Sequence, residues 1–347
     1  MSWKNLVIGL LAGLVLPLAI HSCAARSMGD TLPIITEKYK GVNFTGTSYQ
    51  ITDFSSFDSL KLLGCDWVSF TPFSYMHAKN NPHLADTFPR QWYGESRPGI
   101  REQIDSAHAR GLKVMVKPHI WIVGGGFTGD IDFSSDSKWI EWQNSYATHI
   151  LDYAKLCEEK GADMLCIGNE LKNPVRNSEA FWNALIDSIR MVYKGKLTYA
   201  ANWDNYEQIP FWDKLDVIGI NAYFPLSSKK DPTSKEVEKG WAKWKSGLRK
   251  LKSKTQKPIV FTELGYRAAK YCCDEPWDYS KKQADSDACQ AEAYRAFFNQ
   301  SFGQEVDGVF IWKYFDHNDR HHHRDRYSPQ GRKALAVIES NFKAAAR

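Results

Sequence analysis

The feature that most constrains the fold is an alternation of short apolar runs with amphipathic segments, repeated eight times along the chain. The apolar runs are too short for typical helices, and their largely continuous hydrophobic character is typical of strands buried on both faces. The intervening segments have helical spacing, and glycines such as Gly64, Gly111 and Gly161 are placed to end helices. The eight expected strands are 40–44, 67–72, 113–121, 165–170, 197–203, 217–223, 258–263 and 308–314.

Eight such strands separated by helices predict an α/β fold, a parallel sheet closed into a (β/α)8 or TIM barrel. A chain of 347 residues is long enough for one such domain with insertions. A doubly wound open sheet is the alternative. It would usually show fewer units and a glycine fingerprint after the first strand, where Asn43-Phe44-Thr45-Gly46 offers none. We therefore expect a single catalytic domain at 38–345.

The first 25 residues differ from the rest and indicate an export signal. Lys4 precedes an uncharged apolar run at 6–20, which is too short for a membrane span. Cleavage after Ala24 or Ala25 would release the protein, whereas Cys23 resembles the lipid-modified cysteine of bacterial lipoproteins, although His21 stands where a small residue is usual. We favour the lipoprotein type, with a spacer at 26–37, a lipid anchor at Cys23 and a location in the periplasm or at the cell surface.

Polar and aromatic side chains stand at the ends of the expected strands. In a TIM barrel these ends meet at one face, where enzymes of this fold carry out their chemistry. Amides, carboxylates and indoles together are typical of a sugar site, because apolar sugar faces stack on indole rings. The side chains collected there are Asn43, Thr71, His119, Trp121, Asn169, Glu170, Asn202, Trp203, Tyr223, Glu263 and Trp312.

Glu170 and Glu263 end the fourth and seventh strands, which are not neighbours in an eight-strand barrel. Their carboxyl groups are therefore expected to face each other across the barrel mouth. Glycoside hydrolysis needs such a pair, one to protonate the leaving oxygen and one to face the anomeric carbon. A serine nucleophile elbow, Gly-x-Ser-x-Gly, is absent from the sequence.

The pair resembles the retaining glycosidases on (β/α)8 barrels, in which the glutamate of an Asn-Glu motif is the acid/base and the strand-seven glutamate is the nucleophile. Within that group the chain is similar to glycoside hydrolase family 113, whose members chiefly cleave β-1,4-mannans. The similarity covers about 40–336, and an insertion around Cys272 departs from it, which bears on substrate preference. It is carried by FTELGYR at 261–267, EPWD at 275–278, QA at 290–291, GVFIW at 308–312 and YSPQG at 327–331.

The resemblance implies that Glu170 is the acid/base and Glu263 the nucleophile. Asn169 is expected to bind the sugar 2-hydroxyl, and Tyr223 to donate a hydrogen bond to Glu263. Trp312 is expected to form the platform beneath the sugar at the cleavage point. Four further strand-end residues are substrate-binding candidates: His119, Trp121, Asn202 and Trp203.

The sequence predicts no metal or cofactor. The histidines in the tract 317–323 are contiguous and lack the spacing that aims ligands at one ion. The formal charge of +5 is small and dispersed, which argues against a nucleic-acid partner. Of the six cysteines beyond Cys23, Cys65 and Cys166 are expected to be buried thiols, and one disulfide is expected among Cys272, Cys273 and Cys289.

Three hypotheses follow for the function. The first is a retaining glycoside hydrolase that cleaves β-1,4-mannosidic bonds in mannan-type polysaccharides or oligosaccharides. The second is the same chemistry on another β-glycan such as β-glucan. The third is a sugar-binding lipoprotein without catalysis, which the presence of both glutamates disfavours.

Overall fold

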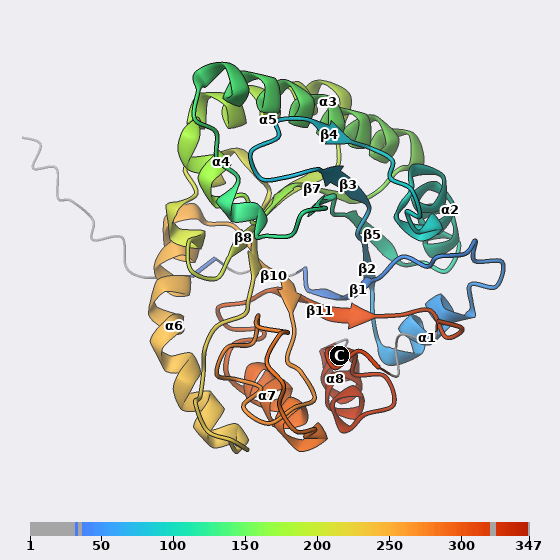
Figure 1. The fold of residues 1–347 in the computed structure, drawn as a ribbon. Helices are drawn as coiled ribbons and strands as arrows, with labels where there is room; N and C mark the ends of the chain where they lie inside the picture. The colour runs from blue at the N-terminus through green and yellow to red at the C-terminus, as the bar shows by residue number, and fades with distance from the viewer. Residues whose placement is uncertain (1–31, 34–36, 320–323, 346–347) are drawn as a thin grey trace, which may run out of the picture. The chain divides into compact units, whose positions relative to one another are not determined.

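The computed structural model describes residues 32–33, 37–319 and 324–345, and it shows eight parallel strands closed into a barrel with helices around it (Figure 1). The strands follow one another around the ring in sequence order, and the last pairs with the first. The predicted (β/α)8 barrel is confirmed. Its strands are β1 (Tyr39–Phe44), β2 (Trp67–Phe70), β5 (Lys113–Val116), β7 (Met164–Asn169), β8 (Lys196–Asn202), β9 (Val217–Asn221), β10 (Ile259–Leu264) and β11 (Gly308–Tyr314).

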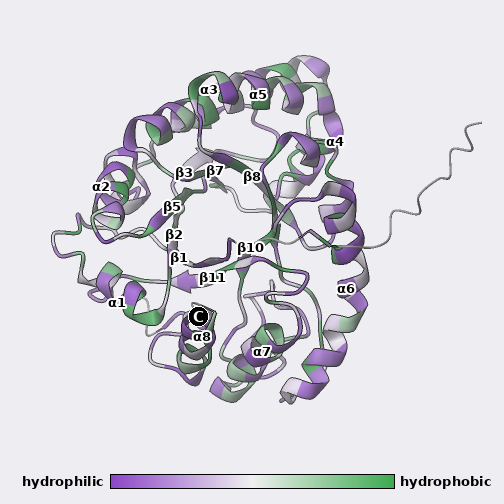
Figure 2. Ribbon diagram, turned by 180° about the vertical axis from the view of Figure 1, so that it is seen from behind, coloured by the Kyte–Doolittle hydropathy of each residue, from purple (hydrophilic) through white to green (hydrophobic). Residues whose placement is uncertain are grey.

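The helices cover the outside of the barrel, and their ribbons carry both hydrophilic and hydrophobic residues (Figure 2). Gly64 and Gly161 end two of them in the left-handed conformation, with φ of 92° and 65°, as the sequence predicts. The helices are α1 (Ser55–Leu63), α2 (Arg97–His108), α3 (Asp136–Lys160), α4 (Lys172–Asn177), α5 (Glu179–Val192), α6 (Ser234–Thr255), α7 (Asp287–Gln300) and α8 (Lys333–Ala344).

The expected export signal, Cys23 and most of the histidine tract lie outside the described residues. Among the helices of the described ranges, none has the length and apolar character needed to cross a bilayer.

The inside of the barrel is filled by side chains from its own strands. A compact cluster of nine buried residues occupies the interior, as is usual in TIM barrels. A larger core lies between the strands and the helices. The interior cluster consists of Tyr39, Trp67, Met115, Met164, Cys166, Ala200, Val217, Val260 and Phe310.

The expected third strand, 113–121, is interrupted in the structure. Its first part is barrel strand β5, whereas β6 (His119–Ile122) pairs with β3 (Phe73–Met76) in a separate three-stranded sheet that also holds β4 (Leu84–Ala85). Pro118 lies between the two parts and Pro72 takes the same place between β2 and β3. Proline has no N–H to donate to a ladder, so each strand is broken there. The expectation that His119 and Trp121 end a barrel strand was therefore wrong, and they belong to this side sheet.

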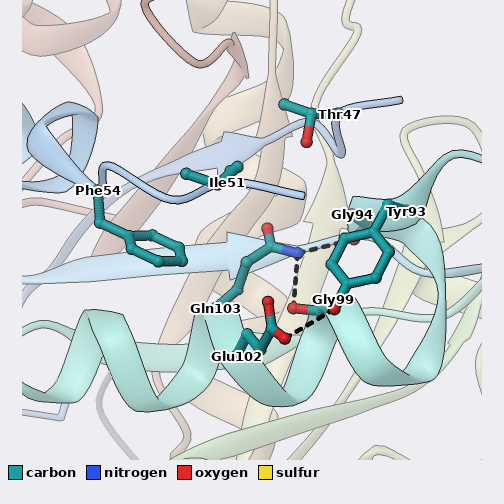
Figure 3. A pocket seen from close by; sticks show the side chains of 8 residues that line it. All are labelled: Thr47, Ile51, Phe54, Tyr93, Gly94, Gly99, Glu102 and Gln103. Atoms are coloured by element: carbon teal, nitrogen blue, oxygen red, sulfur yellow. Dashed lines mark hydrogen bonds between the residues drawn. The ribbon is translucent and has the colours of Figure 1, made fainter. Parts of the chain in front are cut away.

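Close packing joins the segment after β1 to the start of α2 (Figure 3). The Gly94 amide donates a hydrogen bond to the Thr47 carbonyl at 2.9 Å, and the Gln103 side chain donates to the carbonyls of Gly94 and Gly99 at 2.8 and 3.0 Å. The crevice between these residues is too narrow for a water molecule. This contact holds one of the loops at the C-terminal end of the barrel against the outer helices.

Candidate active site

Glu170 directly follows β7 and has a left-handed backbone, with φ of 55°. Its amide donates to the Ala200 carbonyl of β8 at 2.9 Å, which fixes the turn. Its carboxyl oxygen Oε1 accepts a hydrogen bond from Asn221 Nδ2 at 3.1 Å. The side chain is thus held at the end of its strand, at the barrel mouth where the sequence places it.

Glu263 lies on β10, and its side chain is buried, with 4 % of the residue exposed. Lys117 Nζ donates to Glu263 Oε1 at 2.6 Å, and the Tyr223 hydroxyl donates to Oε2 at 2.6 Å, the contact expected from the sequence. Both carboxylate oxygens therefore have a strong donor. Hydrogen bonds and a cation of this kind stabilise the ionised form of a carboxyl group.

Asn221 joins the strand ends that carry the two glutamates. Its Nδ2 donates to Asn169 Oδ1 at 2.9 Å as well as to Glu170, and its Oδ1 accepts from the Thr262 hydroxyl at 2.9 Å. Asn221 is the last residue of β9. In the barrel, β9 pairs with β10, which carries Glu263, and is separated from β7, which precedes Glu170, only by β8. Sequence reasoning did not single it out; the available signal was a buried amide inside an otherwise apolar run.

His119 and Trp312 form a stacked pair beside Glu263. Their rings are 6.0 Å apart and within 5° of parallel, and Lys117 Nζ lies 5.3 Å from the Trp312 ring centre. His119 Nε2 is 3.9 Å from Glu263 Oε1 and, within the described ranges, has no hydrogen-bond partner. Asn43 Oδ1 is likewise buried without a partner there, while its amide donates to the Thr262 and Phe310 carbonyls.

The other candidates make their contacts with residues other than the two carboxylates. Trp121 is 57 % exposed and stands in the side sheet, where it contacts Phe73 edge to face. Trp203 follows β8 and stacks on Trp277 at 4.9 Å between ring centres. Asn202 accepts a hydrogen bond from the Trp203 amide at 2.9 Å. The structure thus provides exposed indole surface on both the side-sheet edge and the β8 edge of the mouth.

The segment after β10 carries Trp277 and is fastened at several points. A disulfide joins Cys272 to Cys289, while Cys273, Cys65 and Cys166 are buried free thiols, which agrees with the expected pattern. The Tyr327 hydroxyl donates to the Pro276 carbonyl at 2.5 Å. Trp277 was not among the residues expected to bind substrate, since its place in an irregular loop gives no strand-end signal.

The two carboxyl groups at the mouth, Glu170 and Glu263, lie in different electrostatic environments. Burial and, second, the nearby Glu263 charge raise the pKa of Glu170 to about 7, against the opposing effects of Asn221 and Lys117. Burial and the Lys117 charge hold the pKa of His119 well below its usual 6.5, so its ring is neutral. Burial raises the pKa of Tyr223 well above 10, which keeps it a donor. A carboxyl that carries a proton near neutrality beside a strongly hydrogen-bonded carboxylate suits acid-assisted displacement.

In the described part of the chain, no group of three or more His, Cys, Asp or Glu side chains is arranged to hold a metal ion. The chemistry available at the mouth from its own side chains is proton transfer and carboxylate attack.

Comparison with known proteins gives a consistent result. The model of Glycoside Hydrolase Family 113 matches residues 41–331. A β-mannanase of that family from Alicyclobacillus acidocaldarius has 26 % sequence identity and a TM-score of 0.77, over 89 % of this chain and 98 % of its own. A second family 113 β-1,4-mannanase has 23 % identity and the same TM-score, over 89 % and 99 %. A β-glucuronidase from Ruminococcus gnavus shares the fold at 13 % identity and a TM-score of 0.58, over 88 % of this chain and 50 % of its own. A search of curated proteins finds no match.

Proposed function

This chain belongs to glycoside hydrolase family 113, and we propose that it hydrolyses β-1,4-mannosidic bonds with retention of anomeric configuration. The family supplies the reaction class, and the related β-mannanases favour mannan-type polysaccharides or oligosaccharides as substrate. The observation that carries the assignment of roles is the unequal treatment of the two carboxyls: Glu263 has a donor on each oxygen, whereas burial raises the pKa of Glu170 to about 7.

In the first step the Glu263 carboxylate attacks the anomeric carbon, and the glycosidic oxygen leaves with the proton of Glu170. The product is a glycosyl ester on Glu263 and a carboxylate on Glu170. In the second step Glu170 takes a proton from water, the water oxygen attacks the anomeric carbon and Glu263 leaves as a carboxylate. Each glutamate ends the cycle in its starting state.

The neighbouring side chains provide for sugar binding. Trp312 is proposed as the platform at the cleavage point, beside the unpartnered His119 Nε2, which suits a sugar hydroxyl. Asn169, oriented by Asn221, is proposed to bind the 2-hydroxyl. The exposed Trp121 and the stacked Trp203, with Asn202 beside it, are proposed to extend the binding surface on either side.

We also propose that the protein is exported and anchored by lipid at Cys23, in the periplasm or at the cell surface. The apolar run at 6–20 and the cysteine that follows it support this proposal. Metabolic labelling with a fatty acid tests it: wild-type chain is expected to incorporate label, and Cys23→Ser is expected to abolish incorporation.

The substrate is tested by incubating purified protein with mannan, glucomannan, cellulose and xylan and separating the products. Mannan and glucomannan are expected to yield oligosaccharides. Cleavage of cellulose alone would show that the substrate is a β-glucan and not a mannan. Tight binding of oligosaccharides without cleavage of any polymer would overturn the proposal that the protein is an enzyme. NMR observation of the first product released distinguishes retention from inversion.

A further inference from the structure

Lys117 is a buried cation in direct contact with Glu263, and its effect on the second glutamate, Glu170, extends its part in the reaction beyond this contact. The residue is 0 % exposed. It follows β5 and reaches across the barrel to β10, where Nζ contacts Glu263 Oε1 at 2.6 Å and the Thr262 carbonyl at 3.4 Å. Because the ammonium is shielded from solvent, its charge is weakly screened and acts on nearby anions.

The charged and titratable groups around Glu170 are few. Asp204, in the loop after β8, acts on Glu170 but is paired with Lys172 at 2.9 Å. His119 is neutral and Tyr223 remains protonated, as described above. The charge of Lys117 acts on Glu170 and is in direct contact with Glu263. The titratable groups that interact with Glu170 from the surrounding elements are Lys117, Asp204, Glu263, Tyr199 and Tyr223.

The proposed reaction moves one negative charge and leaves Lys117 unchanged. Before reaction Glu170 is protonated, Glu263 is an anion and Lys117 is a cation. In the glycosyl-enzyme Glu263 is a neutral ester, and Glu170, having given its proton to the leaving oxygen, is the anion. The three side chains therefore sum to zero in both states, and the ammonium has a counter-charge throughout.

We propose that Lys117 is a positioning residue that serves as the fixed counter-ion of the pair: it orients Glu263 for attack, and in the glycosyl-enzyme it favours ionised Glu170 and so prepares that residue to take a proton from water. The inference rests on the proposed function, because it concerns the second step of that reaction.

The chain offers a matched control in Lys252. This lysine of α6 is 2 % exposed and pairs with the buried Asp307 at 2.7 Å, at the opposite end of the barrel strands. Lys252→Met removes a buried cation from a buried carboxylate just as Lys117→Met does, but away from the mouth. Any effect confined to the Lys117 variant is then specific to the site.

The test measures the titration of Glu170 by carbon NMR in protein labelled at the glutamate carboxyls, with the Glu170→Gln spectrum for assignment. Glu263→Gln removes the charge that ester formation removes. We expect the pKa of Glu170 to fall in this variant by about one pH unit or more, because the repulsive charge of Glu263 is gone and the ammonium of Lys117 is no longer neutralised by it. Adding Lys117→Met is expected to reverse the part of the fall that the ammonium causes, whereas adding Lys252→Met is expected to leave the pKa of Glu170 unchanged.

A pKa of Glu170 that is the same in Glu263→Gln with and without Lys117→Met would overturn the proposal. Lys117→Gln is the second variant, since its amide keeps a hydrogen-bond donor and removes only the charge. If the chain fails to fold with either Met or Gln at this position, Lys117 serves stability alone, and this outcome would also overturn the proposal. The titration needs no substrate. A wild-type chain that fails to cut mannan would overturn the proposed function and leave this result intact.

Discussion

Two buried lysine–carboxylate pairs stand at opposite ends of the barrel strands, and they differ in how completely their surroundings are hydrogen-bonded. At the start of the strands, Asp307 accepts from Lys252, from Lys38 at 3.3 Å and from the Ile259 amide at 3.0 Å. At the mouth, Glu263 is equally well held, yet His119 Nε2 and Asn43 Oδ1 beside it have no partner in the described ranges.

Unpaired buried polar atoms are unfavourable for folding, and native proteins keep few of them. In the described ranges, the unpaired atoms at the mouth belong to uncharged groups that can hydrogen-bond a sugar hydroxyl, whereas the unpaired oxygen near Asp307, Glu305 Oε2, lies 3.6 Å from the Lys245 ammonium. This difference distinguishes a place built to receive a polar ligand from one built to hold the barrel together. The comparison predicts that substitutions at the mouth lower the rate without loss of stability, whereas substitutions at the other end lower the stability without loss of rate.

The largest effect is expected for Glu263→Ala. Loss of the nucleophile should lower kcat by about 10⁴-fold or more, as loss of a residue central to covalent catalysis does. Added azide should restore turnover and give a glycosyl azide of inverted configuration, identified by NMR. A variant that keeps wild-type activity would show that the nucleophile lies elsewhere.

Glu170→Ala is expected to lower kcat/KM on mannan by about 10²–10⁴-fold, the usual contribution of general acid catalysis. The first step on a dinitrophenyl glycoside, whose leaving group needs no proton, should be far less affected. In the wild type, kcat/KM on mannan should fall as pH rises through about 7, because the acid must be protonated. Burst and steady-state kinetics across pH check both statements.

Lys252→Met is expected to lower the free energy of unfolding by about 3–5 kcal/mol, because it leaves the buried Asp307 without its main cation. Activity per folded molecule should remain at the wild-type level. Denaturant titration tests the predicted loss of stability, and a kcat measurement at low temperature tests the predicted activity. A loss of kcat in fully folded protein would contradict the distinction between the two ends of the barrel.

The smallest effect is expected for Glu170→Gln, and it is a gain in stability where Lys252→Met gives a loss. The folded-state pKa of Glu170, about 7, exceeds its ordinary value of 4.5, so its favourable contribution is present below pH 4.5 and is lost as pH rises through 7. At pH 8 the variant should therefore be more stable than the wild type by up to about 3 kcal/mol, and at pH 4 the two should be alike. Thermal unfolding at the two pH values provides the check.

The sequence predicts the barrel and the two glutamates because both depend on local pattern: apolar runs of strand length and the residues that end them. It does not predict which carboxylate Lys117 contacts, or that Asn221 contacts Glu170, since these contacts form only after the ring closes. The helix α8 was also not predicted, although Ala334, Ile338 and Phe342 are buried at spacings of four. The six-residue α4, which contains Pro174, is too short to show a period.

The side sheet of β3, β4 and β6 has a consequence for how enzymes of this kind diversify. Its two longer strands are continuations of β2 and β5 beyond a proline in each, and they pair with each other and not with the rest of the ring. Insertions or deletions in this sheet can therefore lengthen or shorten the rim that carries Trp121 while the register of the ring stays as it is. Natural selection or protein design can therefore change the length of sugar chain that is bound without changing the positions of the two glutamates.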